Sequence, residues 1–205
     1  KMFGNSLAEE YMVLETEKGF TREEIKALIL EGIATSWMPK QRKQQMTKTF
    51  QNTSDWDDPF NLNRFLSAQE DVYARALTEL KNGRKQTHWM WYIFPQIEGL
   101  GYSATTQYYA IKSIAEARHY LNHPILGPRL RACAEAVLAI EGRSVAEIFG
   151  YPDNLKLRSS MTLFACAADD PDTVFVRVLD QYFHSEPDTK TLAILEKSNG
   201  HCPFG

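Results

Sequence analysis

Residues 62–83 read LNRFLSAQEDVYARALTELKNG and carry the clearest structural signal in the chain. Mainly apolar residues recur at helical spacing in this stretch: Leu62, Phe65, Gln69, Val72, Tyr73, Ala76 and Leu80. That spacing places them on one face of an α-helix. Gly83 follows the last of them and is typical of a residue that ends a helix. The stretch therefore predicts one long amphipathic helix.

Helix-start signals recur along the rest of the chain. In a capping box, the side chain of a Ser or Thr and that of a Glu three residues later satisfy free amides of the first helical turn. Four such pairs are present: Ser6–Glu9, Thr21–Glu24, Ser113–Glu116 and Ser144–Glu147. Further helices are predicted at 114–122, 128–140, 144–149, 155–168, 172–183 and 189–197, with Asp153, Asp172 and Asp188 as caps of the last three.

One segment favours an extended conformation. Residues 89–94 read WMWYIF, and aromatic and β-branched residues are enriched in strands. With helices predicted almost everywhere else, the fold class is all-α: a compact multi-helix domain with at most one or two short extended segments and an N-terminal helical appendage.

The composition narrows the function classes. The 205 residues hold 23 basic and 26 acidic side chains, a net charge of −3, so a general nucleic-acid binder is not expected. No apolar run is long enough to span a membrane. A signal peptide is not expected either, because Glu9 and Glu10 interrupt the first apolar stretch, and a signal peptide needs an uninterrupted one. Three cysteines without metal-type spacing predict buried thiols in a reduced, cytoplasmic protein. The sequence does not indicate an oligomeric state.

A polar segment divides the chain. Residues 51–59 read QNTSDWDDP, which is Asp-rich, closed by proline and typical of a linker. We therefore expect a helical segment over 1–54 and a second helical domain over 55–205.

The first segment resembles a known family. The runs MFGNSLAEEY (2–11), GFT (19–21) and GIATSW (32–37) are similar to the extreme C-terminus of adenosine deaminases. The resemblance covers residues 1–50 and implies a helical remnant, since the zinc-binding histidines, the general-acid glutamate and the catalytic aspartates of that family are not in it. An active adenosine deaminase is therefore not expected. We also expect that the chain binds no metal and no cofactor. The alternative is that 1–50 are helices docked on the main domain through a stripe of Leu28, Ile33 and Trp37.

The second segment carries a denser match. The runs DPF (58–60), HWMWYIFPQ (88–96), GLGYS (99–103) and SSMTLF (159–164) resemble the domain-of-unknown-function family 1810 over residues 58–197. This resemblance implies a compact, mainly helical fold. It implies no reaction.

The aromatic run of this segment has two interpretations. Trp89, Trp91 and Phe94 bury a large area if they form a core plug, which is the commoner role of such residues. Alternatively, a ring such as that of Trp91 offers a face on which a planar base stacks. His88 and Gln96 flank the run, where their polar atoms could line the mouth of a pocket.

A second polar cluster surrounds the expected helix start at Asp153. Helical spacing places Lys156 and Ser160 on one face, near amides that attract phosphate or carboxylate. Together with Lys85 after Gly83, and with Ser103, they make a candidate site of positive character.

Other motifs point to no chemistry. His119 and His123 have the spacing of zinc ligands on a helix, but no Glu lies between them and Pro124 follows, which indicates a helix end. Gly99-Leu100-Gly101 lacks the Lys-Ser/Thr ending of a phosphate loop.

Two function hypotheses follow. In the first, the domain binds a small anionic, nucleotide-like metabolite through Lys85, His88, Trp91, Gln96, Ser103, Lys156 and Ser160. In the second, it is a non-catalytic interaction or structural module whose aromatic motif is core. No acid–base pair at a recognisable spacing assigns catalysis to either.

Overall fold

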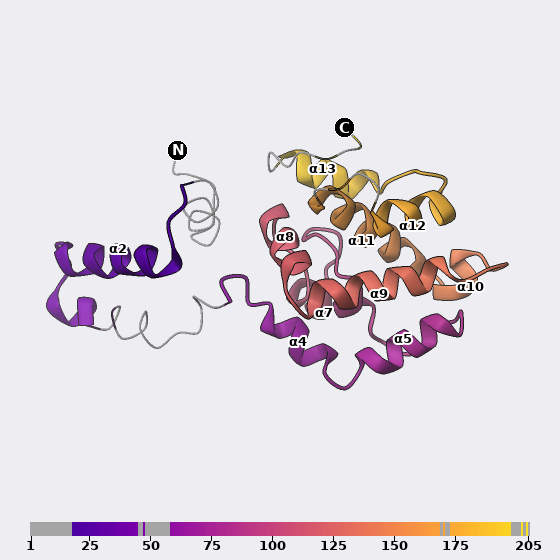
Figure 1. The fold of residues 1–205 in the computed structure, drawn as a ribbon, viewed down its shortest axis with the longest axis horizontal. Coiled ribbons are helices and arrows are strands. Elements are labelled where there is room, and N and C mark those ends of the chain that lie inside the picture. Colours follow the sequence, from indigo (N-terminus) through magenta and orange to yellow (C-terminus); the bar gives the residue numbers. More distant parts are fainter. Residues whose placement is uncertain are drawn as a thin grey trace. The chain divides into compact units, whose positions relative to one another are not determined.

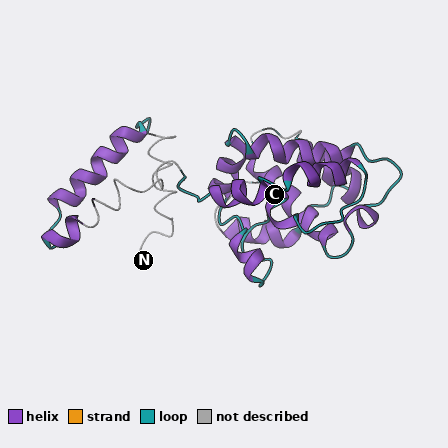
Figure 2. Cartoon of the chain, turned by 90° about the horizontal axis from the view of Figure 1, so that it is seen from below, coloured by secondary structure: helices purple, strands orange, loops and turns teal. Residues whose placement is uncertain are grey.

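A computed structural model of the chain describes residues 18–44, 47, 58–168, 170, 173–197, 202 and 204. All regular elements in these ranges are helices (Figures 1 and 2). The nearest feature to a sheet there is an isolated parallel bridge between Ile97 and Ile111. The all-α prediction is confirmed.

The chain forms two compact units, Lys1–Asn61 and Leu62–Gly205. In the first, helix α2 spans Arg22–Thr35 and begins at the predicted capping box of Thr21 and Glu24. Ile33 of its apolar stripe is buried, but Leu28 is 50% and Trp37 95% exposed. The alternative that this stripe docks on the second unit stays a prediction. The box at Ser6–Glu9 lies outside the described residues.

The stretch that opens the second unit forms two helices rather than one. Helix α4 spans Asn63–Gln69 and α5 spans Tyr73–Lys81, with a turn at residues 70–72 between them. The buried Gln69 side chain donates from Nε2 to the Tyr92 carbonyl and the Tyr120 hydroxyl, at 2.7 and 3.1 Å. The periodic pattern cannot show this break, because its face continues across the turn. Gly83, with φ of 69°, follows the end of α5 as predicted.

The predicted strand at 89–94 is also wrong. Met90–Ile93 form a short helix, α6, and the amides of Ile93 and Phe94 donate to the carbonyls of Trp89 and Met90. Trp89 and Phe94 are fully buried, so the core interpretation is confirmed for these two. A buried single strand would leave its backbone amides without acceptors, whereas a helical turn pairs them locally.

The remaining helices of the second unit pack mainly against its two longest helices, α9 (Leu126–Leu138) and α11 (Asp153–Ala167). Helix α9 lies between α5 and α12 (Val174–Phe183) (Figure 1). Helix α11 contacts α8 (Ile114–Asn122), α10 (Val145–Phe149), α12 and α13 (Thr189–Lys197). The sequence did not predict α7 (Ala104–Tyr108), which the Ser103 side chain caps. From Leu157 onward α11 is almost entirely buried, so it forms the centre of the unit.

The predicted caps have mixed outcomes. The Ser144–Glu147 box is complete, and the Asp188 carboxylate accepts from the Thr191 amide of α13 at 2.9 Å. Ser113 caps α8 alone, because the Glu116 carboxylate turns inward to Arg64. Thr173 caps α12, whereas the predicted cap Asp172 lies outside the described residues.

The cysteines correct a further expectation. Cys133 is a free, buried thiol as predicted, and burial raises its pKa to about 12. Cys166 and Cys202, however, are joined by a disulfide. Their separation of 36 residues matches no local motif, so only the fold brings the two sulfurs together.

Within the described ranges, every helix is too short or too polar to cross a membrane.

Candidate functional site

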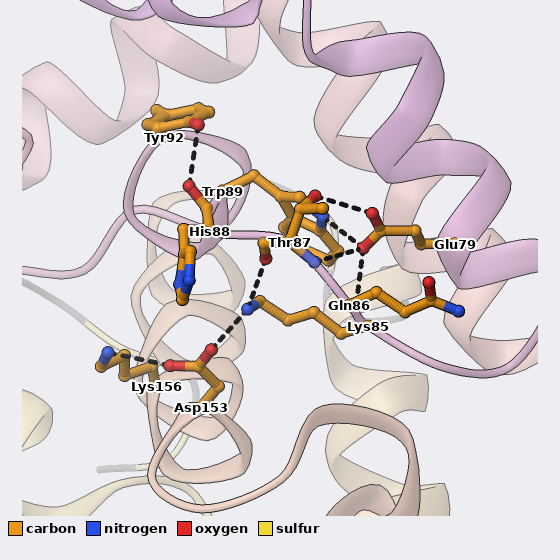
Figure 3. A network of polar contacts seen from close by, with 9 residues as sticks. All are labelled: Glu79, Lys85, Gln86, Thr87, His88, Trp89, Tyr92, Asp153 and Lys156. Carbon is orange, nitrogen blue, oxygen red and sulfur yellow. Dashed lines mark hydrogen bonds and ion pairs between the residues drawn. The ribbon is translucent and has the colours of Figure 1, made fainter.

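The site is built on the loop between α5 and α6, and Glu79 of α5 organises this loop (Figure 3). Its buried carboxylate accepts hydrogen bonds from the amides of Gln86 and Thr87, the Thr87 hydroxyl and the Trp89 indole, at 2.6–3.0 Å. Burial by itself raises the pKa of Glu79, but these four donors outweigh it and lower the pKa to about 2. The loop is therefore held around a carboxylate that stays ionised.

The loop directs Lys85 toward α11. The Lys85 amide donates to the Ile148 carbonyl at 2.7 Å, and its ammonium to the Thr87 carbonyl at 2.8 Å. The ammonium also lies 2.7 Å from Asp153 Oδ2, while Lys156 Nζ lies 2.8 Å from Oδ1 of the same carboxylate. We call these three residues, Lys85, Asp153 and Lys156, the lysine cluster. Two ammonium groups on one carboxylate leave a net charge of +1.

The charges of the lysine cluster are partly buried. The side chain of Lys85 is 7% exposed, that of Asp153 17% and that of Lys156 21%. Burial raises the pKa of Asp153, but hydrogen bonds and Coulombic attraction from Lys156 and Lys85 exceed this effect and lower it overall. Lys156 is the more accessible of the two cations.

Lys156 connects the lysine cluster to an aromatic and hydroxyl pair. Its Nζ lies 4.5 Å from the ring centroid of the half-buried Trp91, within range of a cation–π interaction. The Trp91 indole donates to Thr106 Oγ1 at 3.1 Å, and that hydroxyl shares a 2.7 Å hydrogen bond with Ser103. Four of the predicted residues, Lys85, Lys156, Trp91 and Ser103, therefore belong to one connected set.

The prediction that Asp153 is the N-cap of this helix is wrong. Pro152, rather than Asp153, is the N-cap of α11 and makes no side-chain cap, and Asp153 is the first helical residue. The amides of Asn154, Leu155 and Lys156 already donate to the carbonyls of Gly150 and Pro152. The full positive charges beside this helix start are those of Lys85 and Lys156.

The other predicted residues are placed less directly. His88 is exposed on the loop, its carbonyl accepts from the Tyr92 hydroxyl at 2.9 Å, and in the view of Figure 3 its ring points toward the side of Lys156 and Asp153. Gln96 is half-buried, and its carbonyl accepts from the Ile111 amide. Ser160 is fully buried in α11, and its hydroxyl has no hydrogen-bond partner among the described residues.

Sequence reasoning missed Glu79 and Thr106 and misjudged Asp153. The partners of Glu79 lie 7–10 residues later in an irregular loop, where no periodicity signals a contact. Asp153 has a residue type that suits a cap, and only the approach of Lys85 shows its role as a charge partner.

The described residues contain no group of three His, Cys, Asp or Glu side chains able to hold a metal ion. His123 instead accepts at Nδ1 from the amides of Ile125 and Leu126, at 3.2 and 3.3 Å, where α8 ends. This agrees with its interpretation as a helix-end residue.

Comparisons with known proteins concern mainly the second unit. The chain is similar to the crystal structure of a conserved hypothetical protein of Mycobacterium tuberculosis, Rv1873, with 50% sequence identity and a TM-score of 0.66. The match covers 68% of this chain and 99% of that one. A comparison with curated proteins finds no match. The family model described as "Protein of unknown function (DUF1810)" matches residues 59–195. The chain therefore belongs to the DUF1810 family.

Proposed function

We propose that the second unit binds a small anionic, nucleotide-like metabolite at the lysine cluster. One observation carries the proposal: Lys85 and Lys156 come from separate segments of the chain and meet on a single carboxylate beside Trp91. In a protein of net charge −3, this is a local positive site with an aromatic wall.

Lys156 is the residue best able to meet an anion. It donates one hydrogen bond to Asp153 among the described residues, and an ammonium group has three donors. Lys85 already uses two donors and is more deeply covered. A charge-assisted hydrogen bond contributes about 1.5–3 kcal/mol, so two of them support weak but measurable binding of a phosphate.

The other predicted residues complete the proposal. The exposed hydroxyl of Ser103 is a further polar contact, and Trp91 offers the stacking surface for a planar base. His88 and Gln96 are proposed as the outer polar contacts. Ser160, buried one turn beyond Lys156, is proposed to contribute only if its unpaired hydroxyl becomes accessible on binding.

A titration tests the proposal directly. Isothermal calorimetry and thermal melting of the full chain with AMP, ADP, adenosine and inorganic phosphate should show binding of the phosphorylated compounds. Lys156→Ala should abolish it, whereas Lys190→Ala, which removes an exposed lysine of α13, should leave it unchanged. The proposal is wrong if none of the anions binds, or if both variants bind as the parent does.

The alternative is a non-catalytic interaction or structural module with the aromatic motif as its core. The full burial of Trp89 and Phe94 favours this alternative for part of the motif. It predicts that the titration gives no binding and that Lys156→Ala changes stability alone. The same experiment therefore separates the two.

The resemblance of residues 1–50 to the C-terminus of adenosine deaminases stays a prediction, because the family match begins at residue 59. We propose that this chain does not deaminate adenosine. Formation of inosine from adenosine by the purified protein, followed by ultraviolet absorbance, would contradict this.

A further inference from the structure

The Cys166–Cys202 disulfide is unequally exposed. Cys166 lies in the last turn of α11 and is 3% exposed, whereas Cys202 is half-buried. Disulfides are cleaved by attack of an external thiolate on the accessible sulfur. An incoming thiolate therefore reaches Cys202 more readily than Cys166.

The bond is one of two anchors that flank α13 along the sequence. Before the helix, the Asp188 amide donates to Thr162 Oγ1 of α11 at 2.8 Å. After it, Cys202 is bonded to Cys166 of the same helix. Between these anchors, α13 has nine residues and buries only Thr191 and Leu195. A helix this short is marginal without tertiary support, and the covalent anchor is part of that support.

Helix α13 approaches the glycine loop that leads to the candidate site at one exposed residue, Gly99. A Cβ placed on Gly99, whose φ is 98°, would lie 3.4 Å from Ile194 Cδ1 of α13. Further along the loop, a Cβ on Gly101 would lie 2.6 Å from Thr106 Cγ2. Thr106 in turn accepts the hydrogen bond of the Trp91 indole. The loop therefore has α13 on one side and the support of Trp91 on the other.

We propose that the Cys166–Cys202 pair is a redox-exchangeable site, and that its reduction by a dithiol releases α13 from the Gly99 loop. This inference does not depend on the ligand-binding proposal. In the oxidised form the disulfide ties the chain after α13 to α11, and Ile194 of α13 lies beside Gly99. In the reduced form the Asp188 anchor and the packing of α13 on α11, with Thr191 and Leu195 buried, remain.

The dithiol supplies the two electrons and two protons that the reduction of the disulfide requires. Its thiolate attacks Sγ of Cys202 and forms a mixed disulfide, while Sγ of Cys166 leaves as a thiolate and takes up a proton. The second thiol of the reductant then attacks the reductant's sulfur in that mixed disulfide, and Cys202 leaves and is protonated. The dithiol loses two electrons and two protons to become a disulfide, and the protein gains two thiols.

Hydrogen–deuterium exchange of the full chain tests this inference. The oxidised parent, the parent reduced with dithiothreitol, Cys202→Ser and the control Cys133→Ser are compared. Reduction and Cys202→Ser should accelerate exchange in residues 189–197 and 98–106 roughly tenfold or more, without changing α9. Cys133→Ser, which leaves the disulfide intact, should match the oxidised parent in those two segments.

Two results would overturn the inference. One is equal exchange of residues 189–197 in the oxidised and reduced parent, since the bond would then not hold α13. The other is a count of three free thiols in protein equilibrated with oxidised glutathione and then unfolded, since the bond would then not form. The reduced parent keeps the test decisive even if Cys202→Ser does not fold.

Discussion

Replacing Glu79 with Gln tests the role of the buried carboxylate that organises the site loop. The folded pKa of Glu79 is about 2 against an ordinary value of 4.5. A difference of roughly 2.5 units corresponds to about 3–4 kcal/mol of stability, because each unit is worth about 1.4 kcal/mol. We expect Glu79→Gln to lose most of this at pH 7, since a neutral amide accepts more weakly and its NH2 group meets the same donors.

The sign of the pH dependence follows from the lowered pKa. Both folded and unfolded carboxyls are ionised above about pH 5, so the full contribution is present there. As the pH falls from 4.5 toward 2, the unfolded carboxyl takes up a proton first and the contribution is lost. The parent and Glu79→Gln should therefore differ most at neutral pH and converge in acid.

Urea unfolding, followed by tryptophan fluorescence at pH 7, 4.5 and 3, measures this difference. Glu135→Gln, which neutralises an exposed glutamate of α9, is the control and should follow the parent at each pH. A difference between parent and Glu79→Gln that stays constant from pH 7 to pH 3 would refute the reasoning. So would a loss below about 1 kcal/mol at pH 7, the value of one ordinary neutral hydrogen bond.

Two further substitutions test the packing of the second unit. Gly127→Ala should lower the free energy of unfolding by about 1–3 kcal/mol, because its Cβ would lie 2.0 Å from the Leu121 carbonyl oxygen. The control is Gly32→Ala, whose Cβ meets open space. It should not destabilise the protein in the same thermal melts. Arg64→Met should cost about 3–5 kcal/mol in urea unfolding by leaving the buried Glu116 carboxylate without its cation. Adding Glu116→Leu should recover part of that loss, and no recovery would contradict the ion-pair explanation.

Local signals in the sequence were sufficient for several helices. The predicted ranges 114–122 and 189–197 coincide with α8 and α13, and Ser113 and Asp188 provide side-chain hydrogen bonds at their starts. The Ser144–Glu147 box likewise marks the start of α10. These signals are reliable because a cap and its amides lie within one turn of the chain, so no distant segment is needed to form them.

Segments without such signals were decided by packing. The run 89–94 has the composition of a strand, but a short apolar run also suits a buried helix. The fold supplies no neighbouring strand for it among the described residues, and the backbone pairs locally as α6 instead. In the same way, Gln69 turns inward to Tyr92 and Tyr120, and the helix expected over 62–80 ends there and restarts.

The candidate site also combines features that the sequence determined with features that only the packing decided. The sequence by itself determined which residue types were available, and it singled out Lys85, Lys156 and Trp91 by their chemistry. Only the tertiary structure decided that both lysines meet on Asp153 and that Cys166 pairs with Cys202. Charge pairing and disulfide formation depend on distances between segments far apart in the chain, and those distances exist only once the helices have packed.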